Sequence, residues 1–302
     1  MYVFVEYHAL SAVMEKADLS VLHVGAGRYK PGDMDHATFH IWRELAMGFR
    51  RYTVVGRSTQ AEAAAFNEGD VAVRLLASRI QSEAEFFITQ FQVTTIAAEV
   101  AADVVVAQCP VQGGLVASRI AKRGRARVLM EFHMAHYFED NSLISRNGFL
   151  EWMTRINLTH ATRIRVLSEG MRMKLLMKYG FDYAPRVVVL PPRVDLTRFS
   201  RIKDDWRITG RPKVVMVGTV NQRKGQLLFL NTVIAQGMDI EIWIVGTGPD
   251  LDACNSVAID TGTENQIKLF GQLTHAELAD LLPRADAMVM FSTMEGTPRA
   301  IM

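Results

Sequence analysis

The strongest constraint on the fold is an alternation of short, β-rich apolar runs with segments of helical period along nearly the whole chain. Ten runs have the valine, isoleucine and leucine content of buried strands: LSVLHVG, YTVVG, DVVVAQ, RVLMEFH, RIRVLS, RVVVLP, KVVMVG, IEIWIVG, IKLFG and AMVMFS. Strands that alternate with helices form parallel sheets, and right-handed crossovers place helices on both faces. The sequence therefore predicts an α/β fold with doubly wound, Rossmann-like parallel sheets.

The number of runs also indicates two domains. Ten strands are more than one such sheet comfortably holds, and 302 residues are enough for two cores. Segment 190–212 has three prolines, many charges and no strand period, which is typical of a connection. We predict one domain over residues 1–200 and a second over 201–302. The second domain has only four runs and its last helix has barely begun at Met302, so we expect it to be incomplete.

Composition excludes several classes of protein. The net charge of +2 is too small for a nucleic-acid binder, and no nucleic-acid motif accompanies it. The only two cysteines, Cys109 and Cys254, lie far apart without metal-ligand spacing, which argues against a disulfide framework and a structural zinc site. No uncharged apolar run reaches the roughly 18 residues that span a bilayer. We expect a soluble, cytoplasmic protein.

The positive charge is concentrated in the middle of the chain. Residues 141–200 hold ten Lys and Arg against four Asp and Glu. This segment predicts a solvated face, a site for a phosphate-bearing acceptor, or a surface that holds the protein against an anionic membrane. The helical face for membrane contact would consist of Phe149, Met153 and Ile156 beside Arg146, Arg155 and Arg163.

Ligands of open α/β sheets bind outside the carboxyl ends of the strands, so the segments after the runs are the candidate sites. After LSVLHV comes a glycine-rich stretch with Gly25 and Gly27, followed by Arg28 and Lys30. Bare glycine backbone can approach a phosphate, and the two cations would attract it. A simple glycine turn is the alternative, because the dinucleotide fingerprint fails at its third glycine.

After RVLM, two imidazoles and two carboxylates gather at a strand end, namely Glu131, His133, His136 and Glu139. A metal site is one interpretation, although the helical HExxH spacing is missing. The other is that His133 faces the cleft and donates to a developing negative charge or a sugar hydroxyl.

Two cations and a carboxylate mark the second half. Arg223 and Lys224 directly precede an apolar helix, where positive side chains oppose the helix dipole unless an anion such as a diphosphate binds between them. A solvated surface pair is the alternative. After AMVMFS, Glu295 with Gly296 and Thr297 offers a carboxylate and backbone N–H groups that suit an uncharged sugar.

In this order, the motifs of the second half resemble the donor-binding domain of retaining glycosyltransferases with the two-Rossmann, or GT-B, architecture (glycosyl transferases group one). The resemblance spans about a hundred residues: VVMVG with RKG, then IWIVGTGP, then IKLFGQLTHAELADLLPRADAMVMFSTMEGTP. The first half matches more loosely, through the glycines at 25 and 27, DVVVAQ, MEFHMAHYFE, VLSEGM and VLPPRVDLTRF, and is similar to the acceptor-binding domain.

The resemblance implies a retaining hexosyltransferase-type enzyme that moves a sugar from a nucleotide-diphosphate donor to an acceptor hydroxyl, in polysaccharide or glycoconjugate synthesis. The acceptor would be a sugar, a lipid-linked molecule or a small molecule, and no cofactor or obligatory metal is implied. Lys224, helped by Arg223, would bind the diphosphate, and Glu295 with Gly296 and Thr297 the donor sugar. The remaining implied site residues are His133 by the reaction centre, Gly271 and Gln272 by the nucleobase, and Gly25 and Gly27 over the phosphates.

Three departures from the family pattern matter. Thr219 stands where the family usually has a phosphate-binding Arg, and Pro298 in the EGTP loop has no N–H to offer a ligand oxygen. Counted from Glu295, the second Glu of the family's Glu, seven residues, Glu pattern falls just after Met302. We therefore expect a truncated chain that binds its donor weakly and turns over slowly.

Other functions are compatible with the same pattern, because fold does not fix function. A nucleotide-sugar epimerase or a phosphorylase is an alternative enzyme of this architecture. A non-catalytic nucleotide-sugar-binding subunit is an alternative of a different class, which Thr219, Pro298 and the expected truncation favour.

Overall fold

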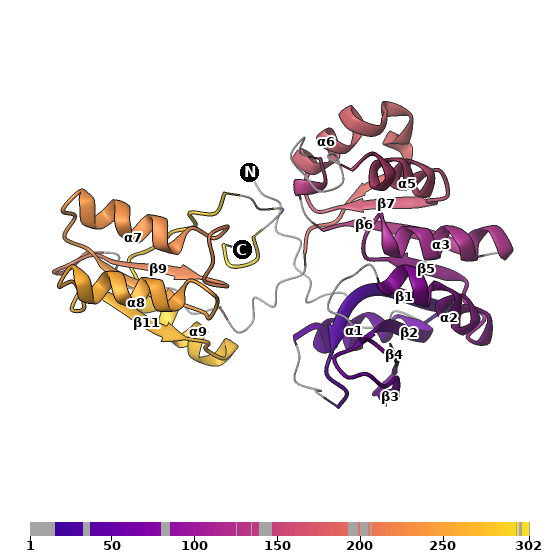
Figure 1. Ribbon diagram of the computed structural model, residues 1–302, viewed down its shortest axis with the longest axis horizontal. Coiled ribbons are helices and arrows are strands. Elements are labelled where there is room, and N and C mark those ends of the chain that lie inside the picture. Colours follow the sequence, from indigo (N-terminus) through magenta and orange to yellow (C-terminus); the bar gives the residue numbers. More distant parts are fainter. Residues whose placement is uncertain are drawn as a thin grey trace. The chain divides into compact units, whose positions relative to one another are not determined.

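The computed structural model describes residues 16–32, 37–79, 85–124, 126–133, 135–138, 147–192, 199, 205, 207–293, 295 and 298–301. The chain divides into two compact units, Met1–Leu190 and Pro191–Met302 (Figure 1). Each unit is built on its own sheet, and all strand pairs but one are parallel. The division lies at the start of segment 190–212, and the boundary that we predict at residue 200 lies within that segment.

The first unit contains an eight-stranded sheet in the order β3-β4-β2-β1-β5-β6-β7-β8. Its strands are β1 (Ala17–Tyr29), β2 (Phe49–Ser58), β3 (Ala64–Glu68), β4 (Val71–Leu76), β5 (Val104–Ala107), β6 (Arg127–Phe132), β7 (Arg163–Val166) and β8 (Val187–Val189). Strands β2, β4 and β3 lie on one side of β1, with β2 next to it. Strands β5 to β8 follow in order on the other side of β1. The point between β1 and β5 is therefore a topological switch, where ligands of such sheets bind.

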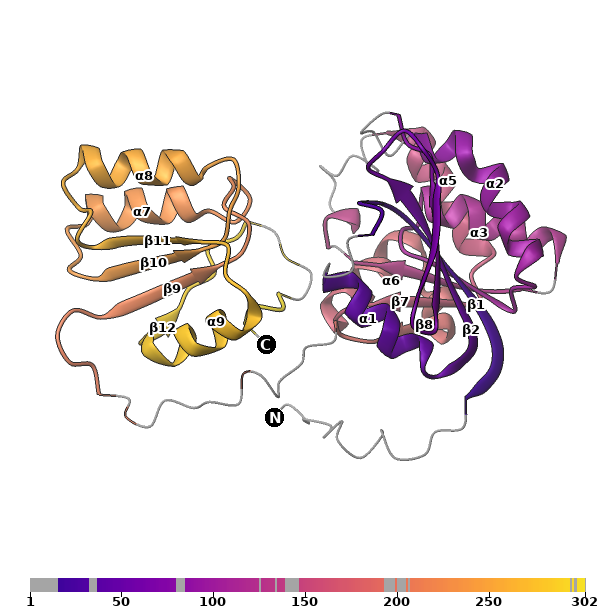
Figure 2. The same cartoon turned by 90° about the horizontal axis from the view of Figure 1, so that it is seen from below.

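Helices cover both faces of this sheet (Figure 2). They are α1 (Ala37–Ala46), α2 (Glu85–Glu99), α3 (Gln112–Arg123), α5 (Gly148–Thr159) and α6 (Glu169–Tyr179), with the 3₁₀ turns η2 (Ala135–Phe138) and η3 (Phe181–Arg186). On one face, α1 packs Phe39 and Trp42 against β1, β2 and β4. On the other face, α2, α3, α5 and α6 form the larger core with the central strands. The predicted doubly wound architecture is confirmed.

The ten strand runs read from the sequence all form strands, but the described residues contain two more. β3 and β4 are an antiparallel hairpin at the edge of the sheet, joined by a turn at Gly69 with φ +55°. The sequence AFNEGDVAVRLL alternates weakly and includes an acidic turn, which is a hairpin signal that our strand pattern does not include. The first sheet is consequently mixed, whereas we predict only parallel strands.

The predicted glycine loop after the first strand is also wrong, because Gly25 and Gly27 lie inside β1. Around these glycines, β1 advances four residues while β2 advances two, so the extra residues bulge out of the ladder. A Cβ at Gly25 would lie 2.0 Å from the side-chain oxygen of Gln108, and one at Gly27 would lie 2.7 Å from the Tyr29 hydroxyl. Their small size thus makes room for two neighbouring polar side chains.

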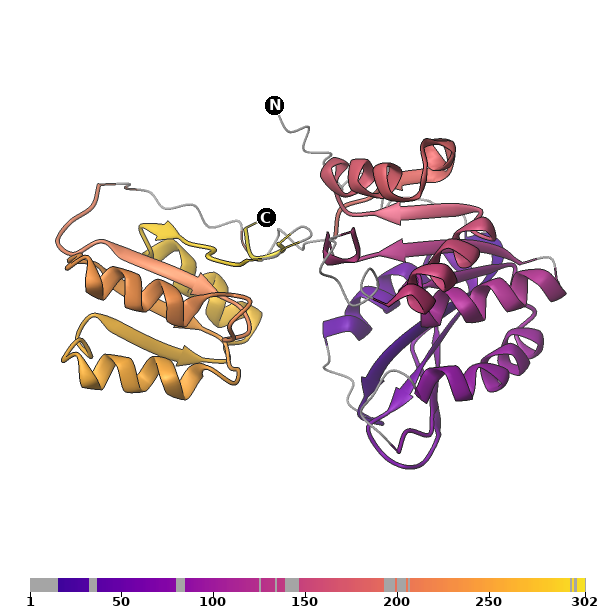
Figure 3. The same ribbon diagram turned by 45° about the horizontal axis from the view of Figure 1, so that its top comes forward.

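The second unit contains a four-stranded parallel sheet in the order β11-β10-β9-β12. Its strands are β9 (Lys213–Val217), β10 (Glu241–Val245), β11 (Ile267–Gly271) and β12 (Ala287–Met288), and its helices are α7 (Gln226–Ala235), α8 (Leu251–Asp260), α9 (His275–Leu281) and the 3₁₀ turn η5 (Leu282–Arg284). Helices α7 and α8 pack on one face and α9 on the other (Figures 2 and 3). Because β10 and β12 flank β9, the switch point of this sheet lies between β9 and β12.

Candidate functional site

The loops after β9 and β12 meet at the switch point of the second sheet. The loop after β9 begins at Gly218 with φ +141° and ends at Gly225, whose φ of +72° starts helix α7 without a side-chain cap. A Cβ at Gly225 would lie 2.4 Å from the carbonyl oxygen of Phe291, in the segment after β12. Only glycine therefore allows the two loops to approach this closely.

Hydrogen bonds fix the shape of the loop after β9. The backbone N–H of Lys224 donates to the side-chain oxygen of Asn221 at 3.0 Å, and the buried Gln226 amide donates to the carbonyl of Thr219 at 3.2 Å. The segment after β12 is tied to the same loop, because the N–H of Thr293 donates to the carbonyl of Arg223 at 2.9 Å. The two predicted ligand-binding segments are thus one connected structure.

The predicted cation and the predicted carboxylate are brought together here. The Lys224 ammonium forms an ion pair with the Glu295 carboxylate, and the two side chains are 18% and 23% exposed. Each group is partly buried yet reachable from solvent, as a ligand-binding pair must be. A phosphate could replace the carboxylate beside Lys224, and Glu295 could then accept from a neutral hydroxyl-bearing group.

The other predicted residues of the second unit are placed as follows. Arg223 is exposed directly before Lys224. Gly271 ends β11 with φ +65°, and its carbonyl accepts from the N–H of Gly246 at 2.7 Å; Gln272 is exposed beside it. Both lie at the carboxyl edge of the sheet, two strands away from β9. Gly296 and Thr297 lie outside the described residues.

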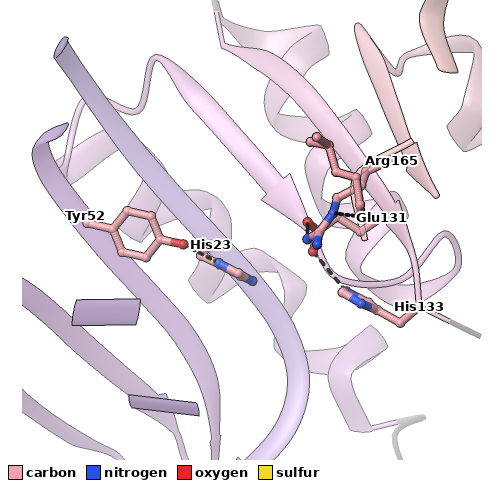
Figure 4. A network of polar contacts seen from close by, with 6 residues as sticks. His23, Tyr52, Glu131, His133 and Arg165 are labelled. Carbon is pink, nitrogen blue, oxygen red and sulfur yellow. Dashed lines mark hydrogen bonds and ion pairs between the residues drawn. The ribbon is translucent and has the colours of Figure 1, made fainter. Parts of the chain in front are cut away.

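In the first unit, His133 belongs to a polar network (Figure 4). Its Nε2 lies 2.9 Å from Oε2 of Glu131, and the other carboxylate oxygen accepts from Arg165 at 2.7 Å. Burial alone would raise the pKa of Glu131, but the His133 hydrogen bond and the charges of the neighbouring side chains hold it at about 2. Glu131 is 6% exposed and His133 39%, so the network leads from the core to the surface.

The sequence prediction misses three members of this region, namely His23, Tyr52 and Arg165. His23 lies within β1, and its Nδ1 is 2.6 Å from the hydroxyl of Tyr52 on β2. In Figure 4 the ring lies between Tyr52 and the Glu131–His133 pair. Its Nε2 is buried and has no hydrogen-bond partner within the described part of the chain. A histidine inside an apolar run gives no sequence signal that separates it from an ordinary core residue.

The His23 environment predicts how stability depends on pH. Burial, the largest cause, lowers the pKa of His23 from 6.5 to about 4. The unfolded chain therefore binds a proton at this residue before the folded chain does, and the free energy of unfolding falls as pH drops from about 6.5 to about 4, by at most about 1.4 kcal/mol for each pH unit. Urea unfolding of the wild type and of a His23→Gln variant at several pH values tests this.

In His23→Gln, the free energy of unfolding should no longer show the fall between about pH 6.5 and pH 4 that this histidine causes. A matched His160→Gln variant, whose ring lies nearer the surface at the end of α5, should keep most of it. The same slope in His23→Gln as in the wild type would contradict the assignment.

The predicted membrane-facing stripe is partly wrong. Met153 is 5% exposed and packs in a small core with Val111, while Phe149 and Trp152 are 62% and 56% exposed and stack with ring centroids 5.9 Å apart. The stripe fails because α5 buries the side that carries Met153 against α3 and the residue before it, Val111. Arg146 lies outside the described residues.

The metal interpretation concerns residues that are only partly described. The side chains of His136 and Glu139 are not among the described ones, and within the described ranges no group of three or more His, Cys, Asp and Glu could hold a metal ion. Among the same residues, no helix is both long enough and apolar enough to cross a bilayer.

Family models match both units of the chain. Residues 34–193 match the glycosyl transferase 4-like domain, and residues 211–302 match glycosyl transferases group 1. The chain belongs to the glycosyl transferase 4-like family. In this glycosyltransferase, the Glu131–His133 network lies in the first matched domain, and the Lys224–Glu295 pair lies in the group 1 domain. No curated protein matches its sequence.

Solved structures share the fold of this glycosyltransferase. Sucrose-phosphate synthase from Thermosynechococcus elongatus has a TM-score of 0.72 at 14% identity, over 93% of this chain and 77% of that chain. Trehalose-6-phosphate synthase, studied for glycosyl transfer with retention, has a TM-score of 0.67 at 10% identity, over 93% and 79%. Anabaena HepE in complex with UDP-glucose has a TM-score of 0.63 at 16% identity, over 94% and 77%. The GT-B resemblance is thereby confirmed at the level of fold.

Proposed function

We propose that this protein transfers a sugar from a nucleotide-diphosphate donor to an acceptor hydroxyl, with retention of the anomeric configuration, in polysaccharide or glycoconjugate synthesis. The observation that carries the proposal is the Lys224–Glu295 pair, which joins a cation and a carboxylate at the switch point of the group 1 domain. The complexes of HepE with UDP-glucose support a nucleotide-sugar donor. The study of retention in trehalose-6-phosphate synthase supports the stereochemistry.

In the proposed complex, the donor diphosphate takes the place of Glu295 beside Lys224, at the start of helix α7. Breaking the bond between the sugar and the phosphate builds negative charge on the leaving diphosphate. The Lys224 ammonium, the exposed Arg223 guanidinium and the positive end of the helix dipole lower the energy of that charge. The proposal requires no cofactor and no obligatory metal, because these groups already supply positive charge.

The remaining contacts of the proposed complex follow from the strand ends. The released Glu295 carboxylate accepts hydrogen bonds from the donor sugar, with Gly296 and Thr297 beside it. Gly271 and Gln272 contact the nucleobase. From the first domain, which we propose binds the acceptor, His133 lies by the reaction centre. We place the enzyme in the cytoplasm, because a cytoplasmic protein has access to nucleotide sugars.

Contact with an anionic membrane stays a prediction of the charge pattern. The exposed pair of Phe149 and Trp152, with Arg155 52% exposed one turn further along α5, would make that contact. A lipid-linked acceptor would bring its hydroxyl to the same domain.

The proposed function is tested by incubating the chain with UDP-, GDP- and ADP-sugars and a mixture of sugar acceptors, followed by NMR of the products. We expect formation of a glycoside whose anomeric configuration equals that of the donor. A product of opposite configuration would contradict retention. Nucleotide-sugar binding without any product would favour the non-catalytic subunit, and a changed sugar without an acceptor product would favour an epimerase.

A further inference from the structure

We propose that Glu131 is a positioning residue that holds the His133 imidazole in one tautomer and presents its Nδ1 as the acceptor of a hydrogen bond from a ligand hydroxyl. The inference rests on the proposed function for the identity of that ligand, a sugar hydroxyl of donor or acceptor. It assigns a role to the ion pair between the buried Glu131 and the partly buried Arg165, which the proposed function leaves without one.

The Glu131 carboxylate is fixed from two sides. Glu131 on β6 and Arg165 on β7 are register partners, so both side chains leave the same face of the sheet. Arg165 donates from Nη1 to Oε1 of Glu131 at 2.7 Å and from Nε to the carbonyl of Leu190 at 3.1 Å. The remaining carboxylate oxygen, Oε2, is the one that meets His133 Nε2 at 2.9 Å. The carboxylate therefore has little freedom to turn away from the imidazole.

The charge of Glu131 determines which nitrogen of His133 carries the hydrogen. The pKa of Glu131 is about 2, so its carboxylate is ionised at neutral pH and can only accept hydrogen bonds. The hydrogen between the two residues must then be on His133 Nε2. In the neutral imidazole the other nitrogen, Nδ1, has a free lone pair and accepts from a hydroxyl. This differs from our sequence interpretation, in which His133 donates.

His133 is placed for such a contact. Its side chain is 39% exposed, whereas its partner Glu131 is 6% exposed, so the ring forms the outer end of the network. His23 lies inward on the same side, and its pKa of about 4 keeps it neutral at neutral pH. Arg165 is accordingly the cation that balances Glu131, and His23 adds no second positive charge beside His133.

The first test is the tautomer of His133 in the full chain. Ring ¹⁵N labelling of all eight histidines, with His133→Gln to assign the signal, reports which nitrogen is protonated. We expect neutral wild-type His133 to carry its hydrogen on Nε2. In Glu131→Gln the partner amide can donate as well as accept, so we expect a mixture of tautomers. The control Glu169→Gln removes an exposed carboxylate that pairs with Arg172 on α6, and should leave the signal unchanged.

The second test is turnover of the nucleotide sugar that the wild type accepts. Misplacing a group at the reaction centre lowers kcat on the order of 10²-fold, so Glu131→Gln should lower kcat by that amount with little change in KM for the donor. Hydrogen on Nδ1 in the wild type, an unchanged tautomer in Glu131→Gln, or unchanged turnover would each overturn the proposal. The tautomer measurement does not depend on enzymatic activity. If the wild type shows the expected tautomer but no turnover, the proposed function fails while the role of Glu131 stands.

Discussion

Replacement of Lys224 by alanine should weaken the binding of nucleoside diphosphates and nucleotide sugars alike, by about tenfold or more. The reason is that the Lys224 ammonium is the cation that the diphosphate meets at the start of α7, and a hydrogen bond to a charged group is worth roughly 1.5–3 kcal/mol. Glu295→Gln should weaken binding of the nucleotide sugar relative to that of the free nucleotide, because only the sugar uses the Glu295 carboxylate as an acceptor. Calorimetric titration of each variant with the nucleotide and its sugar derivative separates the two effects.

A matched control is available in the same unit. Lys268 forms an ion pair with Glu241 at 2.6 Å and is 51% exposed, away from the carboxyl ends of the strands. Lys268→Ala removes the same charge and should leave both affinities unchanged. Equal losses in Lys268→Ala and Lys224→Ala would mean that the effect is one of net charge and that the proposed site is wrong.

Substitution of Gly225 by alanine should destabilise the second unit more than substitution of Gly237, a glycine of similar backbone conformation outside the two loops. Gly225 has φ +72°, and its new Cβ would lie 2.4 Å from a backbone carbonyl of the loop after β12. Gly237 has φ +60° and nothing within 4 Å of its Cβ position, so Gly237→Ala carries the backbone strain without the clash. We expect a loss of about 1–2 kcal/mol for Gly237→Ala and about 1–3 kcal/mol more for Gly225→Ala.

Urea unfolding of the two variants measures this difference directly. Because the clash forces the loops after β9 and β12 apart, Gly225→Ala should also weaken nucleotide binding at the Lys224–Glu295 pair, which Gly237→Ala should not do. Equal stabilities of the two variants would show that the loops do not meet as described.

The fold could be predicted largely from the sequence because parallel strands are buried on both faces. The runs before and after residue 200 stand out as continuous apolar segments, as in VVVA of β5 and EIWIV of β10. The β3–β4 hairpin has no such run, since it lies at the sheet edge and mixes polar with apolar residues. The sequence pattern likewise ends the first strand too early, because glycines such as Gly25 suggest a turn where β1 has a bulge.

The two parts of the site differ in how well the sequence predicts them. The meeting of Lys224 and Glu295 follows from the rule that loops at the carboxyl ends of neighbouring strands converge, once β9 and β12 are recognised. The partner of Glu131 depends on the register between β6 and β7, which no pattern in a single sequence defines. Arg165 and His23 are therefore found only in the structure, although the sequence already points to His133.

Calorimetric titration of the chain with UDP-, GDP- and ADP-sugars up to millimolar concentrations, compared with the same nucleotides without sugar, tests whether the Lys224–Glu295 pair binds a nucleotide sugar. We predict that one nucleotide binds, that its sugar derivative binds with a different affinity, and that Glu295→Gln removes this difference. Absence of binding by every nucleotide, or a sugar contribution that Glu295→Gln leaves intact, would contradict this prediction.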